Sequence, residues 1–415
     1  MKENQEVEFI KQCRLCNSFD LDQILEWGDI ALANSYIKKE DLDKPEDKYP
    51  LTVLKCGECG HIQLRETINS RILFSNYLYA SSTSGSLAKY FETQYVPEVI
   101  EFIELKENSL IIDLGGNDGV TLKYFKERNF RVLNVEPAKN LAKISQDQGI
   151  ETINDFFSEE LSNKIKETYN YPDLIICNNA YMHLDNHQDF TKGIKNLMGL
   201  NTKFVFENAY FLRTVQQNLF DQYYHDHRSF LTVKSLDRYL NKFSLELYYL
   251  KETSIQCGSL RCYVRNKKED SINELINKYI KEEENFGLCY NSTYYNFKDR
   301  VEEIRQNFIN QIADYRNKGK TISCYACPAK FALFSKIFGL NNSFVKYVVD
   351  DSIFKQGLYS PEGKIKIVSQ QYFKDNPTDI CIISASNFAD LIKEKNQWYK
   401  GIFVNPFESL LGKLY

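Results

Sequence analysis

The sequence predicts an α/β protein in which a small N-terminal module precedes two doubly wound, Rossmann-like domains. From residue 110 onwards, short apolar runs alternate with amphipathic segments, which is the pattern of parallel βαβ units. A second series of the same kind begins near residue 321. Before residue 70 the apolar runs are interrupted by glycine and proline, so this module needs a staple to be stable. We place the three domains at 1–70, 71–270 and 271–415.

The strands of the first series are expected where apolar residues follow one another, at 110–114, 131–135, 173–177 and 203–207. Two long polar helices follow at about 271–284 and 295–317, because their charge runs are typical of solvated helix faces. The strands of the second series are expected at 321–325, 344–350, 365–368 and 379–385. Sheets of this kind bind ligands at the carboxyl ends of their strands.

The composition is that of a globular protein. Of the 415 residues 43% are hydrophobic, and 52 basic residues stand against 56 acidic ones, which gives a formal net charge of -4. This balance argues against a nucleic-acid partner. The sequence has no apolar run near the roughly 20 residues of a membrane span, and its first residues lack an apolar signal core. We therefore expect a cytoplasmic protein with no membrane partner, either a monomer or a homodimer.

Four of the eleven cysteines form two pairs of equal spacing, Cys13-x-x-Cys16 and Cys56-x-x-Cys59. Each pair can hold one edge of a metal ion, and the two pairs together complete a tetrahedron. Thiolates select zinc or iron, and four protein ligands leave no open position for chemistry. The sequence therefore predicts a structural zinc site, which is the staple that the N-terminal module needs.

A glycine-rich loop, Asp113-Leu-Gly-Gly-Asn-Asp-Gly119, follows the first strand of the central series. Glycines at a strand-to-helix turn let backbone amides approach a ligand closely. Glu136 ends the next strand about 20 residues later, where a carboxylate can accept hydrogen bonds from ribose hydroxyls. Asp155 and Phe156 follow the third short strand and suit the edge and face of an adenine.

The loop favours S-adenosylmethionine over a dinucleotide. Its glycines are adjacent, unlike those of G-x-G-x-x-G, and an acid precedes them. S-adenosylmethionine is cationic and has no pyrophosphate, so an acidic strand end attracts it. The residues expected to bind the cofactor are Asp113, Gly115, Asn117, Asp118, Glu136, Asp155, Phe156 and Asn178.

Three further features suggest a reaction site. The segment 220–227 holds two histidines beside acidic and aromatic residues, which is typical of proton transfer, although a metal site or an exposed polar turn would also fit it. His183 follows a central strand and is expected at the ligand-binding edge of the sheet. Lys330 ends the sequence CYACPAK, which we interpret as a loop that approaches a phosphate.

Taken in order, these motifs resemble the sugar C-methyltransferase family, which methylates carbon 3 of nucleotide-linked 4-keto-deoxysugars. The likeness covers nearly the whole chain and rests on CRLC, CGECGHIQL, LFSNYLYASSTSGS, DLGGNDG, NVEPAKN, NNAYMHLD, FENAY, FDQYYHDHRSF, CGSLR, CPAK and YVVDDSIFKQGLYSP. The resemblance implies a zinc-binding N-terminal domain and a central methyltransferase domain. It also implies a Rossmann-like C-terminal domain that binds substrate but no second cofactor.

The resemblance also implies roles for individual residues. His227 would be the general base that forms an enolate, with Asp226 as its acidic partner and His183 and Tyr79 as further catalytic groups. Tyr77 would be the less favoured alternative to Tyr79. The residues implied to bind the nucleotide-linked sugar are Tyr77, Ser81, Ser82, Glu207, Tyr224 and Lys330.

The sequence departs from the family pattern at four places. It has Asp226 where glutamate is usual, Gln256-Cys-Gly-Ser259 for His-Gly-Gly-Ser, Gly116 for serine and Cys324 for glycine. Two alternatives therefore stay open: an O- or N-methyltransferase of a sugar or small metabolite, and a noncatalytic zinc-containing scaffold that binds a nucleotide sugar. A zinc-ribbon nucleic-acid module is disfavoured by the absence of a basic stripe in 1–70.

Overall fold

The computed structural model describes residues 6–75, 77–268 and 273–407. The chain forms two compact units, each built from three separate segments. Unit 1 comprises Met1–Asp22, Leu54–Leu212 and Arg228–Cys289, and unit 2 comprises Gln23–Val53, Arg213–His227 and Tyr290–Tyr415. We describe each unit by itself.

Unit 1 contains a seven-stranded sheet in the order β12-β13-β10-β9-β6-β7-β8. The strands are β6 (Leu110–Leu114), β7 (Arg131–Val135), β8 (Glu151–Ile153), β9 (Leu174–Asn178), β10 (Lys203–Ala209), β12 (Leu245–Thr253) and β13 (Ser259–Asn266). The strands from β10 to β8 run parallel, whereas β13 is antiparallel to both of its neighbours. Because the chain moves from β6 to β7 on one side and returns to β9 on the other, the switch point of the sheet lies beside β6.

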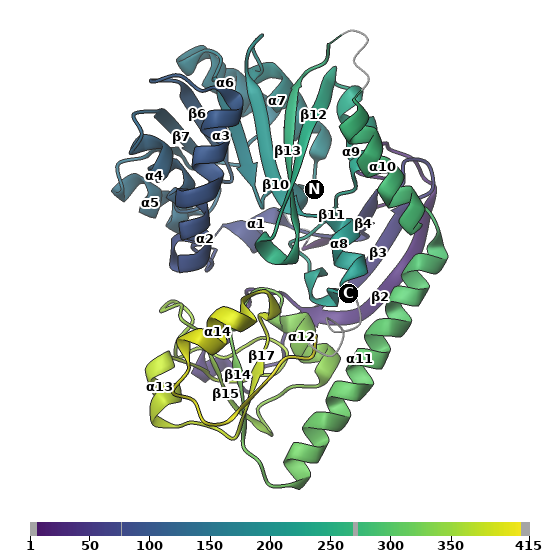
Figure 1. The fold of residues 1–415 in the computed structure, drawn as a ribbon, viewed down its shortest axis with the longest axis vertical. Helices are drawn as coiled ribbons and strands as arrows, with labels where there is room; N and C mark the ends of the chain where they lie inside the picture. Colours follow the sequence, from purple (N-terminus) through teal and green to yellow (C-terminus); the bar gives the residue numbers. More distant parts are fainter. Residues whose placement is uncertain (1–5, 76, 269–272, 408–415) are drawn as a thin grey trace. The chain divides into compact units, whose positions relative to one another are not determined.

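Helices cover both faces of this sheet, as right-handed crossovers require. They are α2 (Gly85–Tyr90), α3 (Val96–Ile103), α4 (Val120–Lys126), α5 (Lys139–Asp147), α6 (Glu159–Tyr169), α7 (His187–Leu197), α9 (Val233–Asn241) and α10 (Glu274–Phe286). Figure 1 shows α3 crossing in front of the sheet. A π-helical turn, Phe91–Tyr95, joins α2 to α3.

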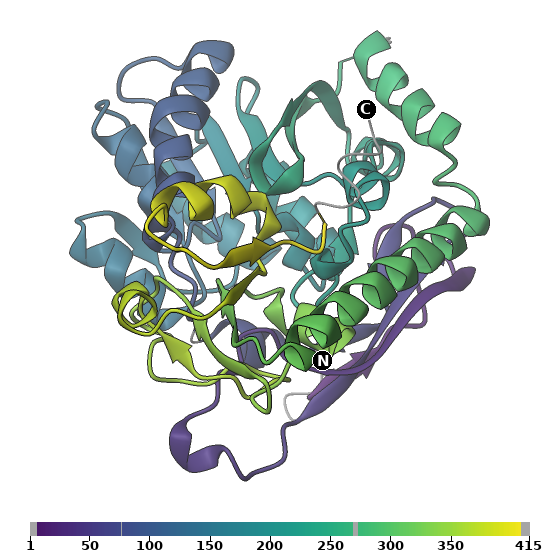
Figure 2. The same ribbon diagram turned by 60° about the horizontal axis from the view of Figure 1, so that its bottom comes forward.

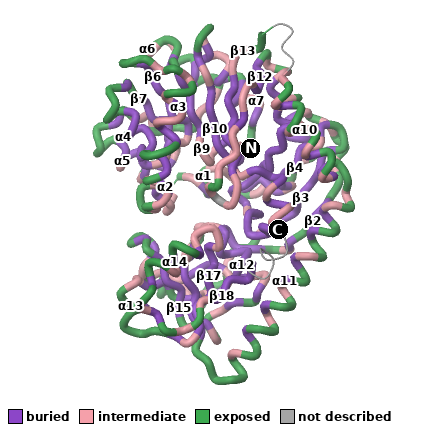
Figure 3. Tube along the Cα trace, in the orientation of Figure 1, coloured by how far each residue is buried: buried purple, intermediate pink, exposed green. Residues whose placement is uncertain are grey.

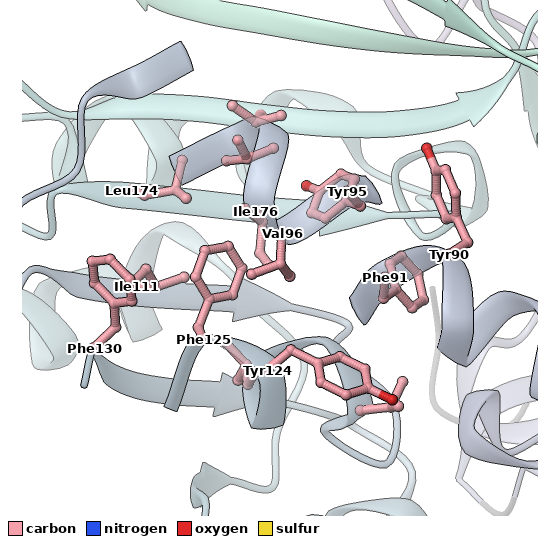
Figure 4. Packing of buried hydrophobic residues seen from close by; sticks show 14 of the residues in the cluster. Tyr90, Phe91, Tyr95, Val96, Ile111, Tyr124, Phe125, Phe130, Leu174 and Ile176 are labelled. Carbon is pink, nitrogen blue, oxygen red and sulfur yellow. The ribbon is translucent and has the colours of Figure 1, made fainter. Parts of the chain in front are cut away.

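The core on the α3 side of this sheet is aromatic. Tyr95 and Val96 pack with Phe125 of α4 against β6 and β9, and Figure 4 shows these side chains among Ile111, Leu174 and Ile176. The strands β6 and β9 are buried almost throughout, as Figure 3 also shows. Strands that are covered on both faces read as continuous apolar runs, which is why the sequence reveals them.

The N-terminal segment forms the strands β1 to β5. In unit 1, β1 (Val7–Phe9) pairs antiparallel with β5 (Glu66–Ile68), and β4 (Ile62–Leu64) pairs antiparallel with β11 (Ser229–Phe230). The strands β2 (Leu21–Ala31) and β3 (Lys48–Cys56) also belong to this segment, and most of their residues are assigned to unit 2. Two further short helices are α1 (Ser70–Phe74), which follows β5, and α8 (Phe211–Gln216), which follows β10.

Unit 2 contains a fully parallel sheet in the order β16-β15-β14-β17-β18. Its strands are β14 (Ile322–Tyr325), β15 (Val345–Val349), β16 (Ile367–Val368), β17 (Ile380–Ile383) and β18 (Ile402–Val404). Its helices are α11 (Asn291–Asn317), α12 (Phe331–Phe338), α13 (Gln370–Asp375) and α14 (Ala389–Lys395), and Figure 2 shows α11 as one long helix. Here β14 lies between β15 and β17, so it marks the switch point of this second sheet.

These two sheets confirm the predicted α/β class with two doubly wound domains. The observed helices α10 and α11 agree with the two expected polar helices, although residues 271–272 of the first lie outside the described residues. The sequence pattern missed the antiparallel hairpin β12–β13 and the short strand β18, whereas the short strand expected before Asp155 is β8. The boundaries 1–70, 71–270 and 271–415 stay a prediction, since they follow chain order and the two compact units do not.

Candidate active site and metal centre

The four paired cysteines come together in unit 1. Their sulfur atoms all lie within 4.8 Å of one another. The shortest distances are 3.6 Å between Cys13 and Cys59 and 3.5 Å between Cys16 and Cys56, so each short pair takes one sulfur from each motif. With zinc–sulfur bonds of about 2.3 Å, the sulfurs of a tetrahedral site are about 3.8 Å apart. The four side chains therefore fit a zinc ion.

Tight turns build the two metal-binding motifs. The amide of Asn17 donates to the carbonyl of Cys13, and the amide of Gly60 donates to that of Cys56, both over 2.9 Å. Asn17 and Gly60 have φ angles of 62° and 75°, which asparagine and glycine adopt more readily than other residues. Each turn brings the second cysteine of its pair back toward the first.

The glycine loop after β6 has no room for side chains. Gly115 has a φ of 74°, and its amide donates to the carbonyl of Val135 over 2.8 Å. A Cβ at Gly115 would come within 2.8 Å of Ala180, and one at Gly116 within 2.3 Å of the amide oxygen of Asn134. The serine that is common in the family at position 116 would therefore require this loop to shift.

Two buried acids flank the loop. The amides of Asn117 and Ala138 donate to the two carboxylate oxygens of Glu136, over 2.9 and 2.8 Å. Burial raises the pKa of Glu136 to about 7. Burial, together with the charge of Glu136, raises the pKa of Asp113 well above its usual range. Within the described residues Asp113 Oδ1 has no hydrogen-bond partner, so a cationic ligand would be a favourable one.

The next two loop residues hold the segment that follows α1. Asn117 accepts a hydrogen bond from the amide of Ser81 and donates one to the carbonyl of Tyr79, over 2.9 and 3.0 Å. Asp118 accepts from the amide of Ser82 over 3.0 Å. The structure therefore brings Tyr79, Ser81 and Ser82 together with the glycine loop.

The remaining predicted cofactor residues lie at the ends of strands. Phe156 lies just after β8 and is 36% exposed, and its amide donates to the carboxylate of Asp155 over 2.8 Å. Asn178 ends β9, next to the switch point. Both strand ends belong to the edge of the sheet that carries the glycine loop.

His183 lies in an aromatic group. Its ring stacks on Phe74 of α1, with centroids 5.6 Å apart and an interplanar angle of 9°. Tyr77 contacts the same Phe74 ring at 5.7 Å. The structure thus brings His183 and Tyr77 together through Phe74, a residue to which the sequence analysis gave no role.

Glu207 forms a buried ion pair. Its carboxylate accepts from Nε of Arg261 and from the hydroxyl of Tyr90, each over 2.8 Å, and its side chain is only 3% exposed. Arg261 also donates to Tyr90 and to Glu98, over 2.7 and 3.0 Å. The expected substrate ligand Glu207 therefore lies in an internal network, and Arg261 within CGSLR is the residue that the analysis missed.

In unit 2, His227 is held by both ring nitrogens. Its Nδ1 lies 2.8 Å from the carbonyl oxygen of Gln222 and its Nε2 lies 2.5 Å from the hydroxyl of Tyr224. Because a carbonyl can only accept, Nδ1 carries the proton, and Nε2 accepts from Tyr224. Burial lowers the pKa of His227 to about 3, a hydrogen bond to Gln222 opposes this shift, and the charge of Lys330 adds to it.

A backbone carbonyl sets the tautomer of the predicted base. The carbonyl of Gln222 accepts the Nδ1 proton of His227 and so fixes its tautomer. Asp226 is buried and accepts from the side-chain amide of Asn34 over 3.4 Å. No side-chain motif reveals a backbone carbonyl, which is why the sequence could not indicate Gln222.

Lys330 follows the CYACP segment and pairs with a buried acid. Its ammonium lies 2.9 Å from the carboxylate of Asp221, which is inaccessible to solvent. Tyr224, Asp226, His227 and Lys330 therefore all belong to unit 2, whereas the predicted cofactor residues belong to unit 1. Asp221 is a charged member of this group that the analysis did not single out.

Three family models match the chain one after another. Residues 13–74 match a zinc-binding domain, residues 87–250 match a methyltransferase domain, and residues 254–407 match the C-terminal domain of C-methyltransferases. The chain belongs to the C-methyltransferase family. The relative NovU, a C-methyltransferase of Streptomyces niveus, is 26% identical to this C-methyltransferase over 401 residues, which make up 96% of this chain and 95% of NovU.

Solved methyltransferase structures resemble parts of this C-methyltransferase. An S-adenosylmethionine-dependent methyltransferase of Clostridium acetobutylicum has 13% identity and a TM-score of 0.34, and the match covers 43% of this chain and 92% of that chain. The magnesium protoporphyrin IX methyltransferase of Synechocystis with bound S-adenosylmethionine has 11% identity and a TM-score of 0.31, and this match covers 42% and 80%.

The two predicted cofactors of this C-methyltransferase, S-adenosylmethionine and structural zinc, are confirmed. The residues fit both groups. Four clustered thiols supply a complete zinc site. The glycine loop after β6 holds two buried carboxylate oxygens, Asp113 Oδ1 and Asp118 Oδ1, that have no hydrogen-bond partner within the described residues. Among the described helices, none has the length and apolar character needed to cross a membrane.

Proposed function

We propose that this C-methyltransferase transfers a methyl group to carbon 3 of a nucleotide-linked 4-keto-deoxysugar, with His227 as the general base. The observation that carries the proposal is the neutral, buried His227, whose Nε2 faces the Tyr224 hydroxyl. Methylation of carbon needs a nucleophilic carbon, and a neighbouring ketone makes the C–H bond acidic enough for a histidine to assist. When bound, S-adenosylmethionine supplies the electrophilic methyl group.

The hydrogen bonds of His227 support a relay through Tyr224. The Tyr224 hydroxyl donates to Nε2, so the phenolic oxygen can take the proton from carbon 3 while its own proton passes to the imidazole. The electron pair of the broken C–H bond then forms the enolate. Nδ1 keeps its hydrogen bond to Gln222 in both states, which holds the ring in one orientation.

The imidazolium that forms would be costly in this buried place without a compensating charge. Asp226, which directly precedes His227 and is itself buried, is the group that we assign to this compensation. This role explains why an acid at position 226 is useful even though it does not set the tautomer. Aspartate in place of glutamate still supplies the charge.

The other residues would bind and orient the two ligands. We assign Asp113, Glu136 and the glycine loop to the cofactor, with Asp155 and Phe156 at its adenine. Tyr79, Ser81 and Ser82 would contact the sugar, because Asn117 and Asp118 of the same loop hold their backbone. His183 and Tyr77, grouped at Phe74, would assist them.

Lys330 is assigned to the diphosphate of the nucleotide. Its ammonium lies 2.9 Å from the buried carboxylate of Asp221, which holds this positive charge in position. Such a substrate belongs to the cytoplasm, where the thiols of this chain also stay reduced. We propose no nucleic-acid partner, and a monomer or a homodimer as the working form.

The proposal is tested by mass spectrometry. Purified protein is incubated in deuterated water with labelled S-adenosylmethionine and a panel of nucleotide-linked 4-keto-6-deoxysugars, and each sugar is also offered in its reduced, 4-hydroxy form. We expect one methyl group on the carbon next to the ketone, and no methylation of the reduced sugars. Equal methylation of the reduced sugars would overturn the proposal in favour of O-methylation. If neither deuterium exchange nor methylation occurred, the result would favour a noncatalytic scaffold.

A further inference from the structure

The two sheets carry the same loop geometry at their switch points. In unit 1, Gly115 after β6 has a φ of 74° and its amide donates to Val135 at the end of β7 over 2.8 Å. In unit 2, Ala326 after β14 also has a φ of 74°, and its amide donates to Val349 at the end of β15 over 2.7 Å. The second loop therefore follows the path of the first although it has no glycine.

The acid after the second strand is repeated as well. Glu136 follows Val135 and accepts from the amides of Asn117 and Ala138, its neighbour two residues on. Asp350 follows Val349 and accepts from the amides of Cys327 and Ser352, over 2.8 and 2.9 Å. A carboxylate can accept about four hydrogen bonds, so in each case capacity for a further donor remains.

Glu136 and Asp350 differ in whether the protein itself supplies such a further donor. In unit 2 the buried ammonium of Lys355 lies 3.3 Å from Asp350 and donates to the carbonyl of Cys327 over 2.9 Å. The hydroxyl of Tyr36 donates to the same carbonyl over 2.9 Å. Glu136 has no ion pair among the residues that the structure describes. Unit 1 thus leaves its acid open to a ligand, and unit 2 fills the corresponding place with its own lysine.

We propose that Lys355 is a positioning residue: it closes the second switch point to a ligand and fixes the loop from Ala326 to Lys330, so that Lys330 is held ready for the nucleotide diphosphate. This inference rests on the proposed function.

The loop is short enough to transmit this restraint. From the fixed Cys327 carbonyl only Pro328 and Ala329 precede Lys330, and proline has a fixed φ. The amide of Phe331 donates back to the carbonyl of Pro328 over 2.9 Å. The far end is anchored by the 2.9 Å ion pair between Lys330 and Asp221. If the Cys327 carbonyl loses its ammonium donor, the backbone that carries Lys330 is less restrained.

The test is calorimetric binding of thymidine diphosphate and uridine diphosphate to Lys355→Met, together with steady-state kinetics. We expect the dissociation constant of the better-bound diphosphate, and the KM of the nucleotide-linked sugar, to rise about tenfold, the size of one charge-assisted hydrogen bond. The kcat and the dissociation constant of S-adenosylmethionine should stay unchanged. The matched control is Lys395→Met, which removes a lysine from an exposed pair with Asp351.

The double variant Asp350→Asn/Lys355→Met separates positioning from stability. It removes both charges and leaves no buried carboxylate unpaired, so the thermal stability lost in Lys355→Met should return. The raised dissociation constant should remain, because the Cys327 carbonyl still lacks its ammonium donor and keeps only the Tyr36 hydroxyl. Recovery of diphosphate binding in the double variant, unchanged binding in Lys355→Met, or no diphosphate binding by the wild-type protein would each overturn the inference. Diphosphate binding without methyl transfer would instead count against the proposed function alone.

Discussion

At the scale of single residues, the state of His227 is decided by atoms that no motif contains. A backbone carbonyl fixes the proton on Nδ1, and a phenol covers Nε2. The sequence could indicate the histidine because two histidines and two acids stand within 220–227. It could not indicate the tautomer, since that depends on how the backbone at Gln222 folds back over five residues.

His227→Asn should lower kcat by about 10²- to 10⁴-fold, because proton transfer loses its acceptor. The dissociation constant of S-adenosylmethionine, measured by calorimetry, should stay within about twofold. The control is His225→Asn, which removes a second buried imidazole whose Nε2 contacts the Pro50 carbonyl. A His227→Asn enzyme with normal turnover would show that another group is the base.

Glu136 should make cofactor binding depend on pH. Burial raises its pKa to about 7, so below that pH the carboxyl is neutral and accepts ribose hydrogen bonds less well. We expect S-adenosylmethionine to bind more tightly as pH rises from 6 to 8. Glu136→Gln should bind about tenfold more weakly and vary less with pH. Asp113→Asn, measured in parallel, separates the titration of the second acid, and a wild-type affinity that is flat from pH 6 to 8 would contradict the assignment.

At the scale of elements, the zinc centre and the segment after it are connected. The guanidinium of the buried Arg228 donates to the carbonyl of Ile68 and to the hydroxyl of Ser70, over 2.6 and 2.9 Å. These residues end β5 and begin α1, which leads to Tyr77 and Tyr79. The fold of the zinc-binding segment therefore sets where these tyrosines begin.

Cys56→Ser should lose zinc and activity together. Three thiolates hold zinc more weakly than four, and the free energy of binding a structural zinc ion stabilises the fold of the segment that binds it. We expect the zinc content, measured by mass spectrometry, to fall well below one ion per chain, and kcat to fall more than S-adenosylmethionine affinity. Cys289→Ser, at an exposed cysteine outside the cluster, is the matched control. Full activity of a zinc-free protein would refute the link.

The network around Glu207 should stabilise the hairpin β12–β13 against β10. Glu207→Gln leaves the buried Arg261 with only the partly exposed Glu98 as a carboxylate partner, and we expect this loss to cost up to about 3 kcal/mol. Hydrogen exchange of the β10 and β13 amides measures this local free energy. Asp147→Asn, in an exposed pair with Lys143, should cause no measurable change. Unchanged exchange with a raised KM for the sugar would instead identify Glu207 as a substrate ligand.

The sequence predicted elements well where both faces of a strand are covered. The runs 110–114 and 131–135 coincide with β6 and β7. The hairpin strands β12 and β13 escaped notice because polar residues such as Lys251 and Arg261 interrupt their apolar pattern. Arg261 is nevertheless buried, and only the facing strand that carries Glu207 makes its burial understandable.

At the scale of the whole molecule, two doubly wound sheets share one loop design but use it differently. Both have a residue with positive φ after the first strand and an acid after the second. Periodicity revealed both sheets, and DLGGNDG revealed the first loop. The sequence indicated the second loop, CYACPAK, as a phosphate-approach loop, but not its likeness to the first loop. Alanine replaces glycine at the left-handed position, and Lys355 is distant in the chain from Ala326.

The way the chain is divided has a practical consequence for exchanging parts between relatives. Each compact unit is assembled from three segments, and the chain changes unit at residues 22, 53, 212, 227 and 289. A fragment that starts at 271 would lack the stretches 23–53 and 213–227, and with them Asn34 and His227. A functional chimera of two such enzymes therefore has to exchange all three segments of a unit together. Recombination at a single crossover would leave at least one unit assembled from segments of both parents.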